Sequence, residues 1–127
     1  MREEVRNWWR QSLEDLDSAE RNLEIGKYYL VAFLCHQACE KGLKSYLMLR
    51  DSKRVLTTHS LVDLGKDAEV PQKVLDCLRN LAPEYTISRY PDVTESLPYE
   101  NYSEGLATDL LDKAKEVFEW LKQKMKR

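Results

Sequence analysis

The 127-residue sequence lacks the features that mark membrane-spanning, secreted and β-sheet proteins. No segment approaches the 18 or more consecutive apolar residues that a membrane helix needs. The charged residues Arg2, Glu3, Glu4 and Arg6 near the start do not fit a signal peptide. No stretch alternates between apolar and polar residues with period two, and no internal repeat is visible. We therefore expect a cytoplasmic protein without a β-sheet.

An excess of positive charge is also absent, since 20 Lys and Arg residues face 22 Asp and Glu residues, for a formal net charge of −2. This balance offers no global electrostatic attraction for duplex DNA, so any contact with nucleic acid must come from a local site. Cysteine is scarce, and Cys35, Cys39 and Cys77 are an odd number set among apolar residues. We expect these thiols to be buried and reduced.

Helical periodicity is what the sequence does contain, because apolar residues recur at steps of three and four over most of its length. We expect the fold to be all-α, with residues 1–127 forming a single domain. The predicted architecture is an up-and-down four-helix bundle with an additional short helix. Two long helices are predicted over residues 3–24 and 27–50. A short third helix is capped by Thr58 and ends near Gly65, and a fourth has Pro71 in its first turn. The last helix begins at Ser103, and its apolar face includes Leu106.

A long segment rich in tyrosine and proline, from Pro83 to Tyr102, precedes the last helix and shows no helical pattern. Loops of this length in compact domains are usually functional or disordered. Disordered segments are typically poor in aromatic residues, whereas this one contains four tyrosines. We therefore expect an ordered loop that packs on the bundle.

The second predicted helix separates an apolar arc from a polar face when residues are placed at 100° intervals. The apolar arc contains Val31, Ala32, Cys35, Ala38, Cys39, Gly42, Leu43 and Tyr46. The polar face contains His36, Gln37, Glu40, Lys41 and Lys44, with Phe33 and Leu47 at its two ends.

Two interpretations of this polar face remain open. The pattern alone favours a solvated stripe with helix-supporting pairs such as Gln37–Lys41 and Glu40–Lys44. The alternative is the lining of a groove in which the two lysines bind phosphate and Gln37 bonds a base or sugar.

Residues 36–44, His-Gln-Ala-Cys-Glu-Lys-Gly-Leu-Lys, resemble the HQA-x-EK-x-LK signature of the HEPN domain, a family named for higher eukaryotes and prokaryotes and suggested to bind nucleotides. Further landmarks follow in the order that this family shows, and together they cover nearly the whole chain. They are Trp9, Asp15-Leu16 with Ala19, Gly26-Lys27-Tyr28-Tyr29, Thr58-His59-Ser60-Leu61 with Leu64, and Arg89-Tyr90-Pro91-Asp92.

The resemblance implies a helical bundle that usually dimerises and is commonly encoded beside a small nucleotidyltransferase. We accordingly expect a homodimer paired with such an enzyme in a toxin–antitoxin-type module. Trp8 and Trp9 point about 100° apart on a helix, so one of them should be exposed, which supports self-association. The residues that we expect to bind a nucleotide or RNA are Gln37, Lys41, Lys44, His59, Arg89 and Tyr90, with His36 and Glu40 completing a structural polar face.

The ribonuclease motif of many family members is an arginine followed by four to six residues and then a histidine, near the start of the last long helix. After Arg89 the three corresponding positions hold Thr94, Glu95 and Ser96, so we expect RNA cleavage to be weak or absent. Arg54 and His59 have a similar spacing but lie before the third helix. The alternatives are a metal-independent ribonuclease that uses His59 and Arg89 despite the altered motif, and a non-catalytic helical adaptor.

His59 and Arg89 each have a structural alternative to a role in binding. His59 can stabilise the connection locally or contact phosphate, and Arg89 can pair with Asp92 or Glu40 or can clamp phosphate beside Tyr90. His36 and Glu40, four residues apart, are too few to hold a metal, so we expect neither a metal nor a cofactor.

Overall fold

The computed structural model describes residues 1–54 and 56–126, and the secondary structure within these ranges is entirely helical. The elements are α1 (Glu3–Glu24), α2 (Tyr28–Arg50), α3 (Leu61–Asp67), α4 (Gln72–Leu81), α5 (Glu84–Ile87), the 3-10 helix η1 (Pro98–Glu100) and α6 (Glu104–Met125). The prediction of an all-α bundle is confirmed. Within the same ranges, no helix combines the length and apolarity that a bilayer crossing requires.

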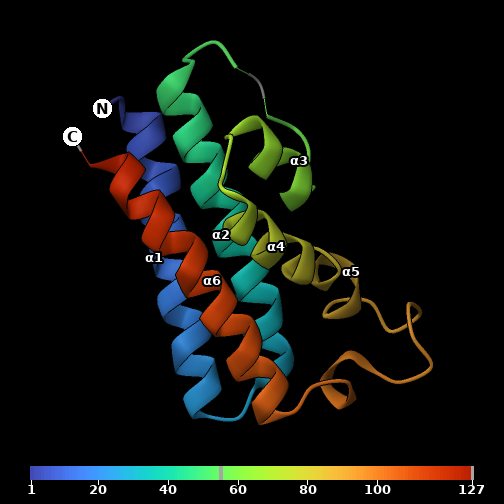
Figure 1. Ribbon diagram of the computed structural model, residues 1–127. Coiled ribbons are helices and arrows are strands. Elements are labelled where there is room, and N and C mark those ends of the chain that lie inside the picture. The colour runs from blue at the N-terminus through green and yellow to red at the C-terminus, as the bar shows by residue number, and fades with distance from the viewer. Residues whose placement is uncertain (55, 127) are drawn as a thin grey trace.

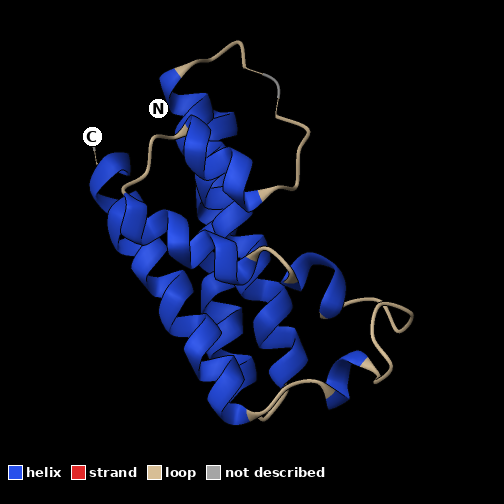
Figure 2. Ribbon diagram, turned by 45° about the vertical axis from the view of Figure 1, so that its right-hand side comes forward, coloured by secondary structure: helices blue, strands red, loops and turns tan. Residues whose placement is uncertain are grey.

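The long helices α1, α2 and α6 lie along one another, and α3, α4 and α5 pack on one side of them (Figure 1). Both chain termini lie at one end of this bundle, and the segment between α5 and α6 extends from the other (Figure 1). The view in Figure 2 shows the same segment standing out from the helices, with η1 near its end. The contacts of α2 extend to every other helix of the bundle, so its residues determine much of the core.

The apolar arc of α2 supplies the centre of the core. Val31, Ala32, Cys35 and Leu43 are fully buried, whereas Tyr46 at the edge of the arc is only partly buried. Gly42 lies on the same arc, where an added Cβ would be 2.8 Å from Leu121 Cδ1. Glycine therefore allows α6 to approach α2 closely, as the packing density of a protein interior demands.

The helix ends follow the sequence signals with one correction at α3. Gly26 has a φ of 78° just beyond α1, a conformation that glycine adopts without strain. The predicted cap Thr58 is wrong: Ser60 is the N-cap, and its hydroxyl accepts a hydrogen bond from Asp63 N. Thr58 Oγ1 instead accepts from Ser60 N at 3.0 Å. Serine and threonine are both favoured at an N-cap, so the sequence alone does not distinguish Thr58 from Ser60. The conformation of the backbone decides which of the two caps the helix.

The cap of α6 is the predicted one, since Ser103 Oγ accepts a hydrogen bond from Leu106 N. Leu106, which was predicted to belong to the apolar face of this helix, is nevertheless 41% exposed, and the buried series of α6 begins at Ala107. The first turn of a helix is commonly covered by fewer neighbours than the turns that follow it.

The segment from Pro83 to Tyr102 was expected to have no helix, yet it contains α5 and η1. The expectation that it packs on the bundle is confirmed, because α5 and η1 both contact α2 and Tyr102 belongs to the buried core. Within the segment, Glu84 forms two hydrogen bonds. The buried Tyr102 hydroxyl donates to the buried Glu84 carboxylate, and Ser88 Oγ donates to the Glu84 carbonyl oxygen at 2.5 Å. Burial raises the pKa of the Glu84 carboxyl and that of the Tyr102 hydroxyl.

Candidate functional site

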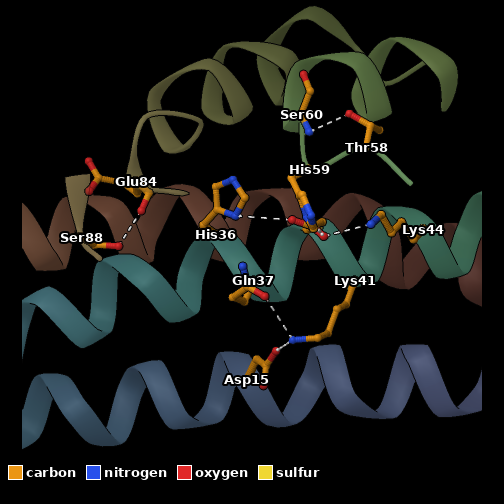
Figure 3. A network of polar contacts seen from close by, with 11 residues as sticks. Asp15, His36, Gln37, Lys41, Lys44, Thr58, His59, Ser60, Glu84 and Ser88 are labelled. Atoms are coloured by element: carbon orange, nitrogen blue, oxygen red, sulfur yellow. Dashed lines mark hydrogen bonds and ion pairs between the residues drawn. The ribbon is translucent and has the colours of Figure 1, made fainter. Parts of the chain in front are cut away.

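The carboxylate of Glu40 lies between His36, Lys44 and His59, and so joins α2 to the chain that leads into α3. Figure 3 shows these three partners. Glu40 is only 4% exposed. Its Oε2 accepts a hydrogen bond from Lys44 Nζ at 2.9 Å and lies 3.0 Å from His59 Nδ1. A buried carboxylate is costly unless it is paired, and these two partners supply the compensating donors.

His36 precedes Glu40 by one helical turn and is fully buried. Its Nδ1 lies 3.8 Å from Glu40 Oε1. Within residues 1–54 and 56–126, neither imidazole nitrogen of His36 nor Glu40 Oε1 has a hydrogen-bond partner. Burial lowers the pKa of His36 from its ordinary value of 6.5 to about 4, so the ring is neutral at physiological pH.

His59 is held in one orientation but remains accessible. Because its Nδ1 faces the Glu40 carboxylate, the proton of the neutral ring belongs on Nδ1 and leaves Nε2 as the acceptor. The ring stacks on Tyr85, with 4.8 Å between centroids and an angle of 20° between planes. Its side chain is 55% exposed. A carboxylate-oriented imidazole with a free Nε2 is an arrangement suited to proton transfer.

Arg89 is positioned by aromatic rings. Its guanidinium carbon lies 4.8 Å from the ring centroid of Tyr85, 5.0 Å from that of Tyr90 and 5.4 Å from that of Phe33. The expected structural pairing of Arg89 with Asp92 or Glu40 is not observed, because no carboxylate in the described part of the chain forms an ion pair with it. Arg89 is exposed, so its guanidinium is accessible to solvent.

The two lysines of the polar face are bound to carboxylates. Lys41 Nζ donates to Asp15 Oδ2 on α1 at 2.6 Å, and it also lies 3.5 Å from Gln37 Oε1. Lys44, only 4% exposed, is paired with Glu40 and lies 5.7 Å from the ring centroid of Trp8. The predicted pairs within α2 are therefore present.

The polar face of α2 is not a solvated stripe, because His36, Glu40 and Lys44 are buried. The predicted site residues divide between its two sides (Figure 3). Gln37 and Lys41 face α1, whereas His36 and Lys44 face the elements that carry His59 and Ser88. Glu40 belongs to the second side, because it contacts His59. Three of the predicted residues meet around the ring of Tyr85, namely His36, His59 and Arg89.

Three residues of this arrangement were not assigned to the site from sequence. Phe33 was visible as an aromatic residue at the end of the polar face, and Tyr85 as one of the tyrosines before the last helix. Asp15 was visible only as a landmark of the family resemblance. Its partner Lys41 is 26 positions away, and only the packing of α1 on α2 joins them.

The remaining candidates are accounted for by local contacts. Arg54 pairs with Asp67 at 2.5 Å, so its spacing from His59 does not create a site. Cys35 and Cys39 are free and buried, and burial raises the pKa of Cys35 to about 12, which keeps the thiol protonated. The described residues contain no group of three or more side chains that could hold a metal ion.

The tryptophans have different surroundings. Trp9 stacks on Phe118 at 5.7 Å, whereas Trp8 packs beside Met48 and Met125 at the end of the bundle that carries the termini. Both are partly buried, so the prediction that one of them is exposed is wrong.

We expect the buried His36 to make stability depend on pH. The unfolded chain takes up a proton near pH 6.5, but the folded chain does so only near pH 4. The free energy of unfolding should therefore fall as the pH falls between these values, by on the order of 3 kcal/mol. Urea denaturation at several pH values measures this loss. The loss of stability at low pH should be smaller in His36→Phe and should remain in the control variant His59→Gln. If the loss in His36→Phe is as large as in the unaltered protein, the pH dependence arises from other groups.

The model of the HEPN domain family matches residues 5–124 of the chain. A similar solved structure is TT1696 from Thermus thermophilus, with a TM-score of 0.89 and 27% identity over 98% of this chain and 100% of that chain. ST0689, an archaeal HEPN homologue, has a TM-score of 0.83 and 34% identity over 99% of this chain and 100% of that chain. An HEPN domain protein from Thermotoga maritima, 21% identical over 92% of this chain and 95% of that chain, shares the fold with a TM-score of 0.71.

No curated protein matches the sequence significantly. The family match extends over nearly the whole chain, and the archaeal HEPN homologue is similar over its full length. These two findings agree with the order of landmarks along the sequence. The chain therefore belongs to the HEPN domain family.

Proposed function

We propose that this HEPN protein binds single-stranded RNA at the surface formed by His59, Tyr85, Arg89 and Tyr90. The observation that carries the proposal is the guanidinium of Arg89, which three rings position and which no carboxylate in the described part of the chain neutralises. An arginine presents several N–H donors in a planar array that matches a phosphate. Such a group on a chain of net charge −2 provides a local site for an anion.

The aromatic residues favour a single strand over a duplex. Tyr90 is 41% exposed and lies beside Arg89, so one of its faces is accessible to an unpaired base. Stacking of unpaired bases on aromatic rings is the common basis for recognising single strands. Lys41 and Lys44 are bound to carboxylates, so we assign them a supporting role beneath the surface.

The substitution Arg89→Ala should weaken the binding of a short single-stranded RNA about tenfold or more, because it removes charge-assisted hydrogen bonds to phosphate. Fluorescence anisotropy with a labelled oligonucleotide measures the dissociation constant. Binding to the unaltered protein should also weaken as salt increases, since phosphate contacts release counterions.

Arg50→Ala provides the matched control for Arg89→Ala. Arg50 is also exposed and lies 5.5 Å from the ring centroid of Tyr46, but it is paired with Glu69 at 3.0 Å. Its removal should leave RNA affinity unchanged. Equal affinities for both variants and the unaltered protein, with a lower melting temperature in Arg89→Ala, would support a helical adaptor instead.

A second candidate function, RNA cleavage, is supported by the Glu40–His59 contact of 3.0 Å. In this reaction the 2′-hydroxyl oxygen attacks the neighbouring phosphorus while its proton passes to His59 Nε2. The 5′-oxygen leaves with a proton from water, which yields a cyclic phosphate and a 5′-hydroxyl. Arg89, on the same Tyr85 ring as His59, stabilises the added negative charge.

We expect cleavage to be weak or absent, because no histidine follows Arg89 at the spacing of the family motif. A positioned acid or base typically contributes about 10²–10⁴-fold to such a rate. Purified protein incubated with mixed RNA in the presence of a chelator tests this expectation. Robust cleavage that is lost in His59→Gln but retained in Arg50→Ala would make the second candidate the principal function.

For its assembly, we propose a homodimer that is paired with a small nucleotidyltransferase in a toxin–antitoxin-type module. Family membership supports this assignment, together with the position of Trp8. Trp8 lines a shallow surface with Asn7, Gln11 and Lys41, which combines an aromatic ring and polar groups as protein interfaces do.

Light scattering at micromolar concentration should give a mass of about twice 15.0 kDa. Trp8→Ala should shift this mass toward that of one chain if Trp8 lies in the interface, because buried tryptophans contribute strongly to association. A mass of 15.0 kDa for the unaltered protein would remove the homodimer from the proposal.

A further inference from the structure

A cleft of about 490 Å³ lies between the start of α2 and the segment that joins α5 to α6. The lining residues that matter for its chemistry are Lys27, Tyr28, Tyr29, Arg89, Pro98 and Tyr99. Its volume falls within the range of about 300–1,000 Å³ that is usual for small-molecule sites. The cleft is therefore large enough for one nucleotide.

The charge of this cleft is positive although the chain is acidic overall. Lys27 and Arg89 contribute two cations to the lining, and no Asp or Glu lines it. Neither cation forms an ion pair with any residue in the ranges 1–54 and 56–126. Two unneutralised cations at one cleft favour an anion, and a phosphate monoester carries about −1.5 to −2 charges near neutral pH.

The remaining lining offers an apolar, planar platform. Tyr99 is 62% exposed, and Pro98 and the 45% exposed Leu97 lie beside it in the lining. An exposed tyrosine next to proline and leucine suits stacking with a flat ring. A nucleotide combines a flat ring with a phosphate and so matches both parts of the lining.

The cleft exists before any ligand binds, because the segment that forms one of its walls is held at both ends. Glu84 bonds Ser88 at the start of this segment and Tyr102 at its end. Inside the segment, Leu97 N donates to Glu100 Oε1 at 3.0 Å, and Asn101 Nδ2 donates to Thr94 Oγ1 at 3.0 Å. A preformed wall lowers the entropic cost of binding.

Arg89 joins the cleft to the proposed RNA surface, since it lines the cleft and also lies over the Tyr85 ring that stacks on His59. We propose that the cleft binds the terminal nucleotide of a single strand, with the terminal phosphate held by Lys27 and Arg89 and the base against Tyr99. The rest of the strand then continues over Arg89 toward His59. This inference rests on the proposed function, and it means that the protein recognises the end of a single-stranded RNA.

The test compares linear oligouridines that carry a phosphate at the 5′ or the 3′ end with a circular oligouridine of the same length, which has no end. Fluorescence anisotropy should show about tenfold tighter binding of one linear form. In Lys27→Ala and Tyr99→Ala, the affinity for the preferred linear RNA should fall to that for the circular RNA. Tyr99→Phe keeps an aromatic ring and should retain the tighter binding of the linear RNA. Lys122→Ala, which removes an exposed lysine near the end of α6 that carries the C-terminus, is the control.

Each result separates the inference from the proposed function. Equal affinity for linear and circular RNA would overturn the strand-end inference while leaving RNA binding in place. Absence of binding to every oligouridine would overturn both. Competition by uridine 5′-monophosphate but not by uridine, together with the preference for a linear form, would support the cleft as the phosphate site. The same competition without that preference would identify a free mononucleotide as the ligand and overturn the inference.

Discussion

The buried carboxylate of Glu40 is the constraint on which the candidate site depends. A charge removed from water must be paired, and Lys44 and His59 are the partners that the fold brings to it. The contact with His59 orients the imidazole and connects the chain before α3 to α2. Tyr85 stacks on that imidazole, and Arg89 lies over Tyr85. One buried charge thus determines the position of an accessible imidazole and, through a ring, the surroundings of an accessible guanidinium.

The cationic side chains around the site are of two kinds, lysines that are paired with carboxylates and an arginine that is not. Lys41 and Lys44 are bound to Asp15 and Glu40, so their charge serves to hold α1 and α2 together and to balance a buried group. Arg89 is held by rings, which position a guanidinium without neutralising it. A protein of net charge −2 can thereby present positive charge at one place.

The segment between α5 and α6 links the fold to the site. Its sequence is rich in tyrosine and proline, and the tyrosines have separate roles according to their surroundings. Tyr102 is buried against Glu84 and anchors the segment, whereas Tyr90 and Tyr99 are exposed where Arg89 and the cleft lie. Anchored ends and exposed rings in one segment combine a stable surface with groups that are free to contact a ligand.

The sequence by itself determined the helices, the apolar arc of α2 and the family, because periodicity and local motifs depend on residues within a few turns of one another. It also indicated His59, Arg89 and Tyr90. It did not show that Lys41 is bound to Asp15, that Ser60 rather than Thr58 caps α3, or that the polar face of α2 is largely buried. Those features arise from contacts between residues distant in the chain, and only the packing of α1 and of the chain around α3 and α5 against α2 decides which charges meet and which remain free.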